Sequence, residues 1–192
     1  ALPLIRWLST KFLIPTSEDL ELATDEGEQV ILEKRKINIG ITSESVGDAV
    51  RSLEEAKAHV EHYEAMITRI GKKAKDWEEN KMLDGVLRLH FSLKLSALVY
   101  DVWKKENGEF VKKEEIKGVL KDLLRLAAEY NAFIRIDLEE YGYRDITMEI
   151  YREVIEELAL EDKGLVVWDE RGTLRMGVVV QAYLKDSGKV LS

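Results

Sequence analysis

Short β-branched segments alternate with amphipathic helical segments along this chain, and the alternation limits its fold more than any other feature. Strand-like segments are expected at residues 36–41, 89–96, 132–138 and 175–183, where β-branched and other apolar residues concentrate. Longer segments with helical apolar spacing separate them. Because strands that alternate with helices are typical of parallel β/α units, we expect an α/β fold with a parallel sheet.

The first helix between two predicted strands has a clear start signal. Ser52 is followed three residues later by Glu55, which is the pattern of a capping box. Apolar residues then recur at helical spacing. Glycine often ends a helix, so we expect this one to run to about Ile70 and to stop at Gly71.

Further helices are expected on both sides of this one. Helical apolar spacing predicts helices at residues 2–13, 17–33, 113–130 and 145–158. In the helix at 113–130, the stripe expected to be buried consists of Ile116, Val119, Leu120, Leu123, Leu124 and Ala127.

The length of the chain limits how large its barrel can be. The chain has 192 residues, of which 45% are hydrophobic, enough for one domain with a sizeable core. A complete eight-fold β/α barrel needs about 250 residues. Four strand–helix units therefore predict the amino-terminal half of a (βα)8 TIM-type barrel at residues 36–192, preceded by a helical arm at residues 1–35.

Charge and composition narrow the classes of partner. The formal net charge is −8, so we expect an acidic surface and no nucleic-acid partner, because phosphate binding needs clustered basic residues. The sequence has no cysteine, which excludes disulfides and fits a reducing cytoplasm. No apolar run reaches the roughly 18 residues of a membrane-spanning helix.

Polar residues stand at or near the end of each predicted strand. They are Glu44 or Asp48, Lys94, Asp137 and Gln181. In β/α barrels the chemistry lies at the carboxyl ends of the strands, so these residues are the candidate site. Lys94 and Asp137 could form a structural ion pair instead. A buried strand lysine is also a competent nucleophile, which leaves Schiff-base chemistry at Lys94 as a further alternative.

The remaining candidates concern a cofactor or a metal ion. The amide of Gln181 both donates and accepts, which suits the edge of a heterocyclic cofactor. Tyr183, two residues later on the same predicted strand, either lines the pocket or packs in the core. The three histidines, His59, His62 and His90, lack the spacing of a metal site, and none is expected.

Three blocks of sequence resemble proline dehydrogenases, in particular the bifunctional bacterial family called proline utilization A. FSLKLSAL, at residues 91–98, resembles the strand that carries the active-site lysine. AFIRIDLEEYGYRDIT, at 132–147, resembles the next strand and its loop, and GVVVQAYLKD, at 177–186, resembles the strand that contacts the flavin. The turn ESVGDAV, at 44–50, resembles the family's Asp-x-x-Gly-Glu turn. In this sequence the first acid is Glu44 instead of aspartate, and the second is Asp48 instead of glutamate.

The resemblance implies a role for each candidate residue. Lys94 would bind the carboxylate of L-proline, and Asp137 would orient the polar network around substrate and flavin. Gln181 would hydrogen-bond the isoalloxazine ring of FAD, with Tyr183 as a further cofactor contact. Asp48 would stand on the substrate side, although it is one methylene shorter than the family's glutamate.

The resemblance also implies an activity and its partners. L-Proline would be oxidised to pyrroline-5-carboxylate, and the electrons would pass from FAD to a quinone. A cytoplasmic protein is implied, with peripheral association at the inner membrane through the quinone, and a homo-oligomer is a further expectation.

The family's flavin-contacting arginine and its arginine pair for the proline carboxylate come from later segments. We therefore expect the chain to supply part of the active site, completed by the remaining carboxyl-terminal barrel segments or by a partner chain. The alternative is a catalytically incomplete barrel that acts as an assembly or binding module.

Overall fold

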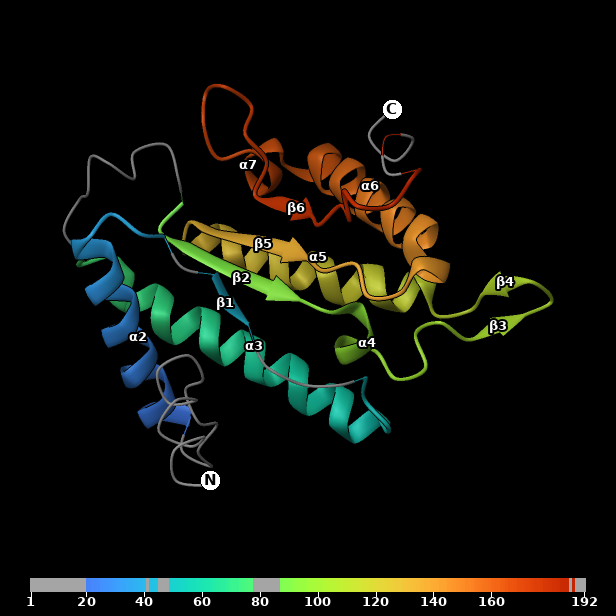
Figure 1. The fold of residues 1–192 in the computed structure, drawn as a ribbon, viewed down its shortest axis with the longest axis horizontal. Helices are drawn as coiled ribbons and strands as arrows, with labels where there is room; N and C mark the ends of the chain where they lie inside the picture. The colour runs from blue at the N-terminus through green and yellow to red at the C-terminus, as the bar shows by residue number, and fades with distance from the viewer. Residues whose placement is uncertain (1–19, 41, 45–48, 78–86, 187, 189–192) are drawn as a thin grey trace. The chain divides into compact units, whose positions relative to one another are not determined.

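The chain divides into two compact units, of which the larger contains the main sheet. The structure is a computed structural model that describes residues 20–40, 42–44, 49–77, 87–186 and 188, with residues 20–27 and 44 described by their backbone alone. One unit consists of Ala1–Ile41 with Asp76–Val86, and the other of Thr42–Lys75 with Leu87–Ser192. Figure 1 traces both. The helix predicted at residues 2–13 lies outside the described residues.

Helix α2, Leu20–Lys36, belongs to the smaller unit and ends in a turn that the sequence analysis mistook for a strand. Asn38 adopts a left-handed backbone with φ of 63°, and the N–H of Ile39 donates to the carbonyl of Lys34 at 3.0 Å. These are features of a Schellman helix end, where asparagine tolerates the left-handed conformation. The strand predicted at residues 36–41 was therefore wrong.

The larger unit contains a sheet of four parallel strands in the order β1-β2-β5-β6. The two central strands, β2 and β5, are aligned so that Leu93 pairs with Ile136. The predicted α/β fold with a parallel sheet is thus confirmed, although the strands are shorter than expected. Their bounds are Thr42–Glu44 for β1, Leu89–Leu93 for β2, Ala132–Ile136 for β5 and Met176–Val178 for β6.

Three long helices connect these strands and supply nearly half of the buried apolar side chains in the described residues. The apolar side chains on one face of the sheet are buried, and α5 packs against β5 while α6 packs against β6 (Figure 1). Burial of one large apolar side chain contributes about 1.5–3 kcal/mol. The three helices are α3, Leu53–Ala74, α5, Lys113–Glu129, and α6, Arg144–Glu161. Of the stripe predicted on α5, Ile116, Leu120, Leu123, Leu124 and Ala127 are buried, and Val119 is half-buried.

The smaller elements were not expected from the sequence. A hairpin follows β2, and its turn consists of Asn107 and Gly108, both with positive φ, as an Asn-Gly turn requires. The remaining elements are α4, Leu95–Leu98, hairpin strands β3, Lys105–Glu106, and β4, Glu109–Phe110, the 3-10 turn η2, Tyr141–Tyr143, and α7, Lys163–Val166.

Helix α3 begins as predicted and continues past the predicted stop. The Ser52 hydroxyl accepts the N–H of Glu55 at 3.1 Å, which caps the helix. Gly71 lies inside the last turns, and the prediction that it ends the helix was wrong. A Cβ at Gly71 would come within 2.4 Å of Cγ of Tyr130. Glycine is therefore needed here because the ring of Tyr130 packs directly on the helix backbone.

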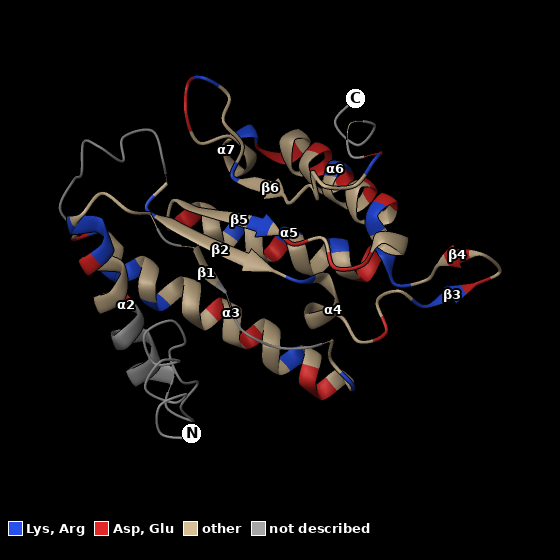
Figure 2. Cartoon of the chain, viewed as in Figure 1, with Lys and Arg blue, Asp and Glu red and all other residues tan. Residues whose placement is uncertain are grey.

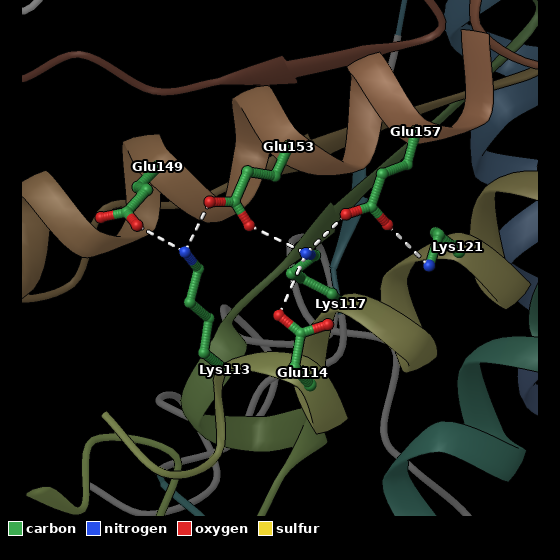
Figure 3. Close-up of polar contacts among 7 residues, drawn as sticks. All are labelled: Lys113, Glu114, Lys117, Lys121, Glu149, Glu153 and Glu157. Carbon is green, nitrogen blue, oxygen red and sulfur yellow. Dashed lines mark hydrogen bonds and ion pairs between the residues drawn. The ribbon is translucent and has the colours of Figure 1, made fainter. Parts of the chain in front are cut away.

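Helices α5 and α6 are joined by a ladder of ion pairs, shown in Figure 3. Lysines and arginines recur every fourth residue on α5 and face glutamates that recur every fourth residue on α6. Lys117 is the central cation, with a side chain only 5% exposed, and it lies 2.8 Å from Glu153 and 2.6 Å from Glu157. The other rungs are Lys113 with Glu149 and Glu153, Lys121 with Glu157, and Arg125 with Glu161.

These contacts change the proton affinity of the groups that make them. Hydrogen bonds from Lys117 and Lys121 lower the pKa of Glu157 to about 2. Hydrogen bonds to Glu153 and Glu157 raise the pKa of Lys117. Figure 2 shows acidic and basic residues interspersed along α3, α5 and α6. In the ladder, each basic residue is paired with a carboxylate, so the charges largely offset one another.

Gly71→Ala is expected to destabilise the protein, whereas Gly118→Ala is expected to stabilise it. The methyl group at residue 71 meets the ring of Tyr130, and such overpacking costs about 1–3 kcal/mol. Around Gly118, also in a helix, nothing lies within 4 Å of the added carbon. Alanine there gains up to about 1 kcal/mol of helix propensity. Urea unfolding of both variants checks the opposite signs, and equal effects would contradict the packing account.

Glu157→Gln is expected to lower stability near neutral pH and to lose that disadvantage in acid. Because the folded-state pKa of Glu157 is depressed, its contribution is present above its unfolded pKa of about 4.3 and is lost as the pH falls toward 2. The difference in urea midpoint between wild type and variant should therefore shrink progressively from about pH 5 down to about pH 2. A difference that is independent of pH would contradict this assignment.

Lys117→Met is expected to lower the free energy of unfolding by about 1–3 kcal/mol near neutral pH.

Candidate active site at the carboxyl ends of the strands

Lys94 and Asp137 immediately follow two neighbouring parallel strands. Lys94 comes after β2 with an extended backbone, and Asp137 comes after β5. The N–H of Asp137 donates to the carbonyl of Leu93 at 2.9 Å, so the strand pairing continues by one bond beyond β5. The structure thus places these two predicted site residues at the same edge of the sheet.

The carboxylate of Asp137 has an ion pair that the sequence analysis overlooked. Oδ1 of Asp137 lies 3.6 Å from Nε of Arg135, two residues earlier on β5. Residues two apart on a strand point to the same face, so alternation could have indicated this pair. The predicted ion pair between Lys94 and Asp137 stays a prediction.

Gln181 lies beyond β6 and reaches back to the loop after β5. Its Nε2 donates to the carbonyl of Leu138 at 3.4 Å. The strand predicted at 175–183 was wrong in length, because β6 ends at Val178. Tyr183 consequently does not share a strand with Gln181, and its side chain is 79% exposed, so it does not pack in the core. A contact between Tyr183 and a cofactor stays a prediction.

The first strand contributes less to the described site. β1 ends at Glu44, which is paired in register with Ser92 of β2. Asp48 lies outside the described residues. Its predicted place on the substrate side is therefore still a prediction.

A second contact joins the loops after β2 and β5. Both the N–H and the hydroxyl of Ser96 donate to the carboxylate of Glu139, the N–H at 3.2 Å. Ser96 is buried in the first turn of α4. No local pattern indicates this pair, because its members lie 43 residues apart and neither belongs to a local motif.

Some buried side-chain polar atoms lack a hydrogen-bond partner on the face of the sheet that the long helices leave open. Among the described residues, the buried side-chain atoms that lack a hydrogen-bond partner are Nε2 of His90, Oγ of Ser92 and Nε of Arg135. All three residues occupy this face by strand alternation. Burial lowers the pKa of His90, whose ring lies 5.0 Å from that of Phe133.

Gly177 on β6 lies on the same open face. A Cβ at this position would come within 2.8 Å of Cζ of Phe133. The absence of a side chain on Gly177 therefore makes room for the phenylalanine ring.

Aromatic and ionic contacts hold the loops beyond the strand ends. The ring of Trp103, near the hairpin, stacks on that of Tyr143 with centroids 4.6 Å apart. Nη1 of Arg144 donates to Asp186 at 2.7 Å and lowers the pKa of that carboxyl group. Tyr141 donates to the same carboxylate at 2.8 Å. The loops after β2, β5 and β6 are thus joined to one another.

The described part of the chain contains neither a membrane-spanning helix nor a metal-binding cluster. Within it, no helix has the length and apolar character needed to cross a bilayer. The same residues contain no group of three or more histidine and acidic side chains arranged to bind a metal ion.

Comparison with known proteins identifies the family. The sequence matches the pattern of the proline dehydrogenase family over residues 28–192. Comparison with curated protein sequences gives no match.

Among solved structures, the chain is similar to proline utilization A from Bdellovibrio bacteriovorus inactivated by N-propargylglycine, with 28% identity and a TM-score of 0.72 over 86% of this chain. A mutant of proline utilization A from Bradyrhizobium japonicum has 22% sequence identity and a TM-score of 0.62. A proline utilization A with proline bound in remote sites has 23% identity and a TM-score of 0.65. Each similarity covers 91% of this chain.

The similarity covers a small part of those proteins. This chain spans 17% of the Bdellovibrio chain and 16% of the other two. The two comparisons below 25% identity support the fold alone. The family match, in contrast, covers most of this chain. The chain therefore belongs to the proline dehydrogenase family.

Proposed function

We propose that this chain supplies part of the active site of an FAD-dependent enzyme that oxidises L-proline to pyrroline-5-carboxylate in proline catabolism. The observation that carries the proposal is the position of Lys94, Asp137 and Gln181, which follow three adjacent strands of a chain in this family. In β/α barrels this edge of the sheet is where substrates react.

Each residue has a role that suits its chemistry. The ammonium group of Lys94 binds the carboxylate of proline as a point charge with three rotatable donors. Asp137, held near Arg135, orients polar groups between substrate and cofactor. The amide of Gln181, already at the loop after β5, hydrogen-bonds the heterocyclic edge of the cofactor.

The residues present fit a flavin. A flavin edge carries both donors and acceptors, and the strand ends offer a carboxylate, an amide and the Nε of Arg135, which has no hydrogen-bond partner. When bound, FAD supplies the two-electron acceptor that no side chain of this chain provides. Proline loses a hydride from ring carbon 5 and a proton from its nitrogen, which leaves the C=N bond of the product.

The open face of the sheet supports the proposal that other segments complete the site. Within the described residues, the buried side-chain polar atoms that lack a hydrogen-bond partner all belong to this face. In a closed barrel, side chains from the remaining strands fill this space. We propose that carboxyl-terminal barrel segments or a partner chain do so here, and that a quinone finally accepts the electrons.

Lys94→Met in the full-length protein is expected to lower kcat/KM for proline by about 30- to 160-fold, because loss of one charged contact to a carboxylate costs about 2–3 kcal/mol. The measurement is bleaching of the visible flavin band on addition of proline. Lys57→Met is the matched control, because Lys57 is exposed on α3 and pairs only weakly with Glu61 at 3.7 Å.

Two results would count against the proposal. One is a full-length wild-type protein that takes up no FAD on titration. The other is a flavin-loaded protein whose spectrum proline leaves unchanged. Either result would favour the alternative that the barrel serves as an assembly or binding module.

A further inference from the structure

We propose that Glu139 is a positioning residue for Lys94, a role that rests on the proposed function of Lys94 in binding proline. Glu139 does not follow a strand directly, and no role for it came from the sequence. Its carboxylate accepts both donors of Ser96, a residue that is 6% exposed and lies two positions after Lys94.

Two contacts hold the backbone on either side of Lys94. Before it, the carbonyl of Leu93 accepts the N–H of Asp137 at 2.9 Å. After it, Ser96 donates to Glu139. We call these two contacts the strand-end tie. Because Asp137 and Glu139 are separated by a single residue, the tie fixes Lys94 and Asp137 relative to each other.

The cap of α4 explains why this task falls to a residue from another loop. Lys94 occupies the N-cap position of α4, and its side chain makes no cap hydrogen bond there. Serine, threonine, asparagine or aspartate would normally accept an N–H of the first turn from this position, and lysine has no acceptor. Glu139 accepts the N–H of Ser96 instead. A lysine at this position therefore depends on an acceptor supplied from the loop after β5.

A negative charge is also suited to this place. The Ser96 contacts are charge-assisted, because a carboxylate accepts from an N–H and an O–H at once. The carbonyl of Ser96 in turn accepts the N–H of Val50, so the same residue joins the segment before α3 to the strand ends. Loss of Glu139 would free the backbone that carries Lys94 while leaving the helices and the sheet intact.

The test compares Glu139→Ala, Ser96→Ala and the double variant in the full-length protein loaded with FAD. Glu139→Ala is expected to raise KM for proline by about 10- to 50-fold, the cost of losing a charge-assisted hydrogen bond. We expect kcat to change by less than about threefold and the affinity for FAD to be retained, because the change weakens ground-state and transition-state binding alike. Ser96→Ala should add little in the Glu139→Ala background.

Glu161→Gln is the matched control. Glu161 accepts from Nη2 of Arg125 at 2.7 Å, so the variant also loses the charge of a glutamate in an ion pair. It lies at the far end of α6, about 27 Å of helix from the strand ends. Its KM for proline should equal that of the wild type.

A second readout does not depend on activity. Without substrate, limited acetylation followed by peptide mapping reports the accessibility of Lys94, and hydrogen exchange reports the backbone at residues 93–98. Both rates should rise in Glu139→Ala and not in Glu161→Gln. If the wild type does not oxidise proline, the proposed function fails while these rates still test the tie.

Two outcomes would overturn the positioning role. The first is unchanged exchange and unchanged labelling of Lys94 in Glu139→Ala. The second is a lower melting temperature with KM for proline equal to that of the wild type, which would make Glu139 a structural residue only.

Discussion

Parallel pairing between β2 and β5 is the constraint on which the candidate site depends. Parallel strands present their carboxyl ends at one edge, and the register that pairs Leu93 with Ile136 brings the next residues, Lys94 and Asp137, to that edge together. The helices between the strands return the chain to the opposite edge each time. A shift of one residue would turn every apolar side chain of β2 away from the core, so burial of the core and placement of the site specify the same register.

The sequence predicted the long helices and three of the four strands of the main sheet, because these follow from periodicity within one segment. Helix 113–130 was found to within one residue. The predicted boundaries of helices and strands were wrong where a local sequence pattern fits two structures. Alternation at residues 36–41 fitted a strand, yet Asn38 marks a helix end. Gly71 resembled a helix stop, and the ring of Tyr130, which packs against it, comes from a distant segment. The boundary between a helical arm and the barrel at residue 35 stays a prediction.

The candidate site was likewise predictable from the sequence only in part. Lys94, Asp137 and Gln181 could be placed from sequence because each follows a recognisable strand, and resemblance to a family gave them roles. Contacts between loops, such as that of Ser96 with Glu139, could not be foreseen, since they depend on which strands become neighbours. The unpartnered atoms on the open face likewise appear only once the strands are aligned.

The spacing of the ion-pair ladder has a mechanical consequence. Its rungs join residues that are 36 or 40 positions apart, and charges repeat every four residues on both helices. Lys113 already contacts Glu149 and Glu153 at once. Sliding one helix by a turn would exchange partners at the inner rungs and leave most charges neutralised. The ladder therefore resists separation of α5 and α6 far more than it resists shear, and the apolar contacts of each helix with its strand must set their axial alignment.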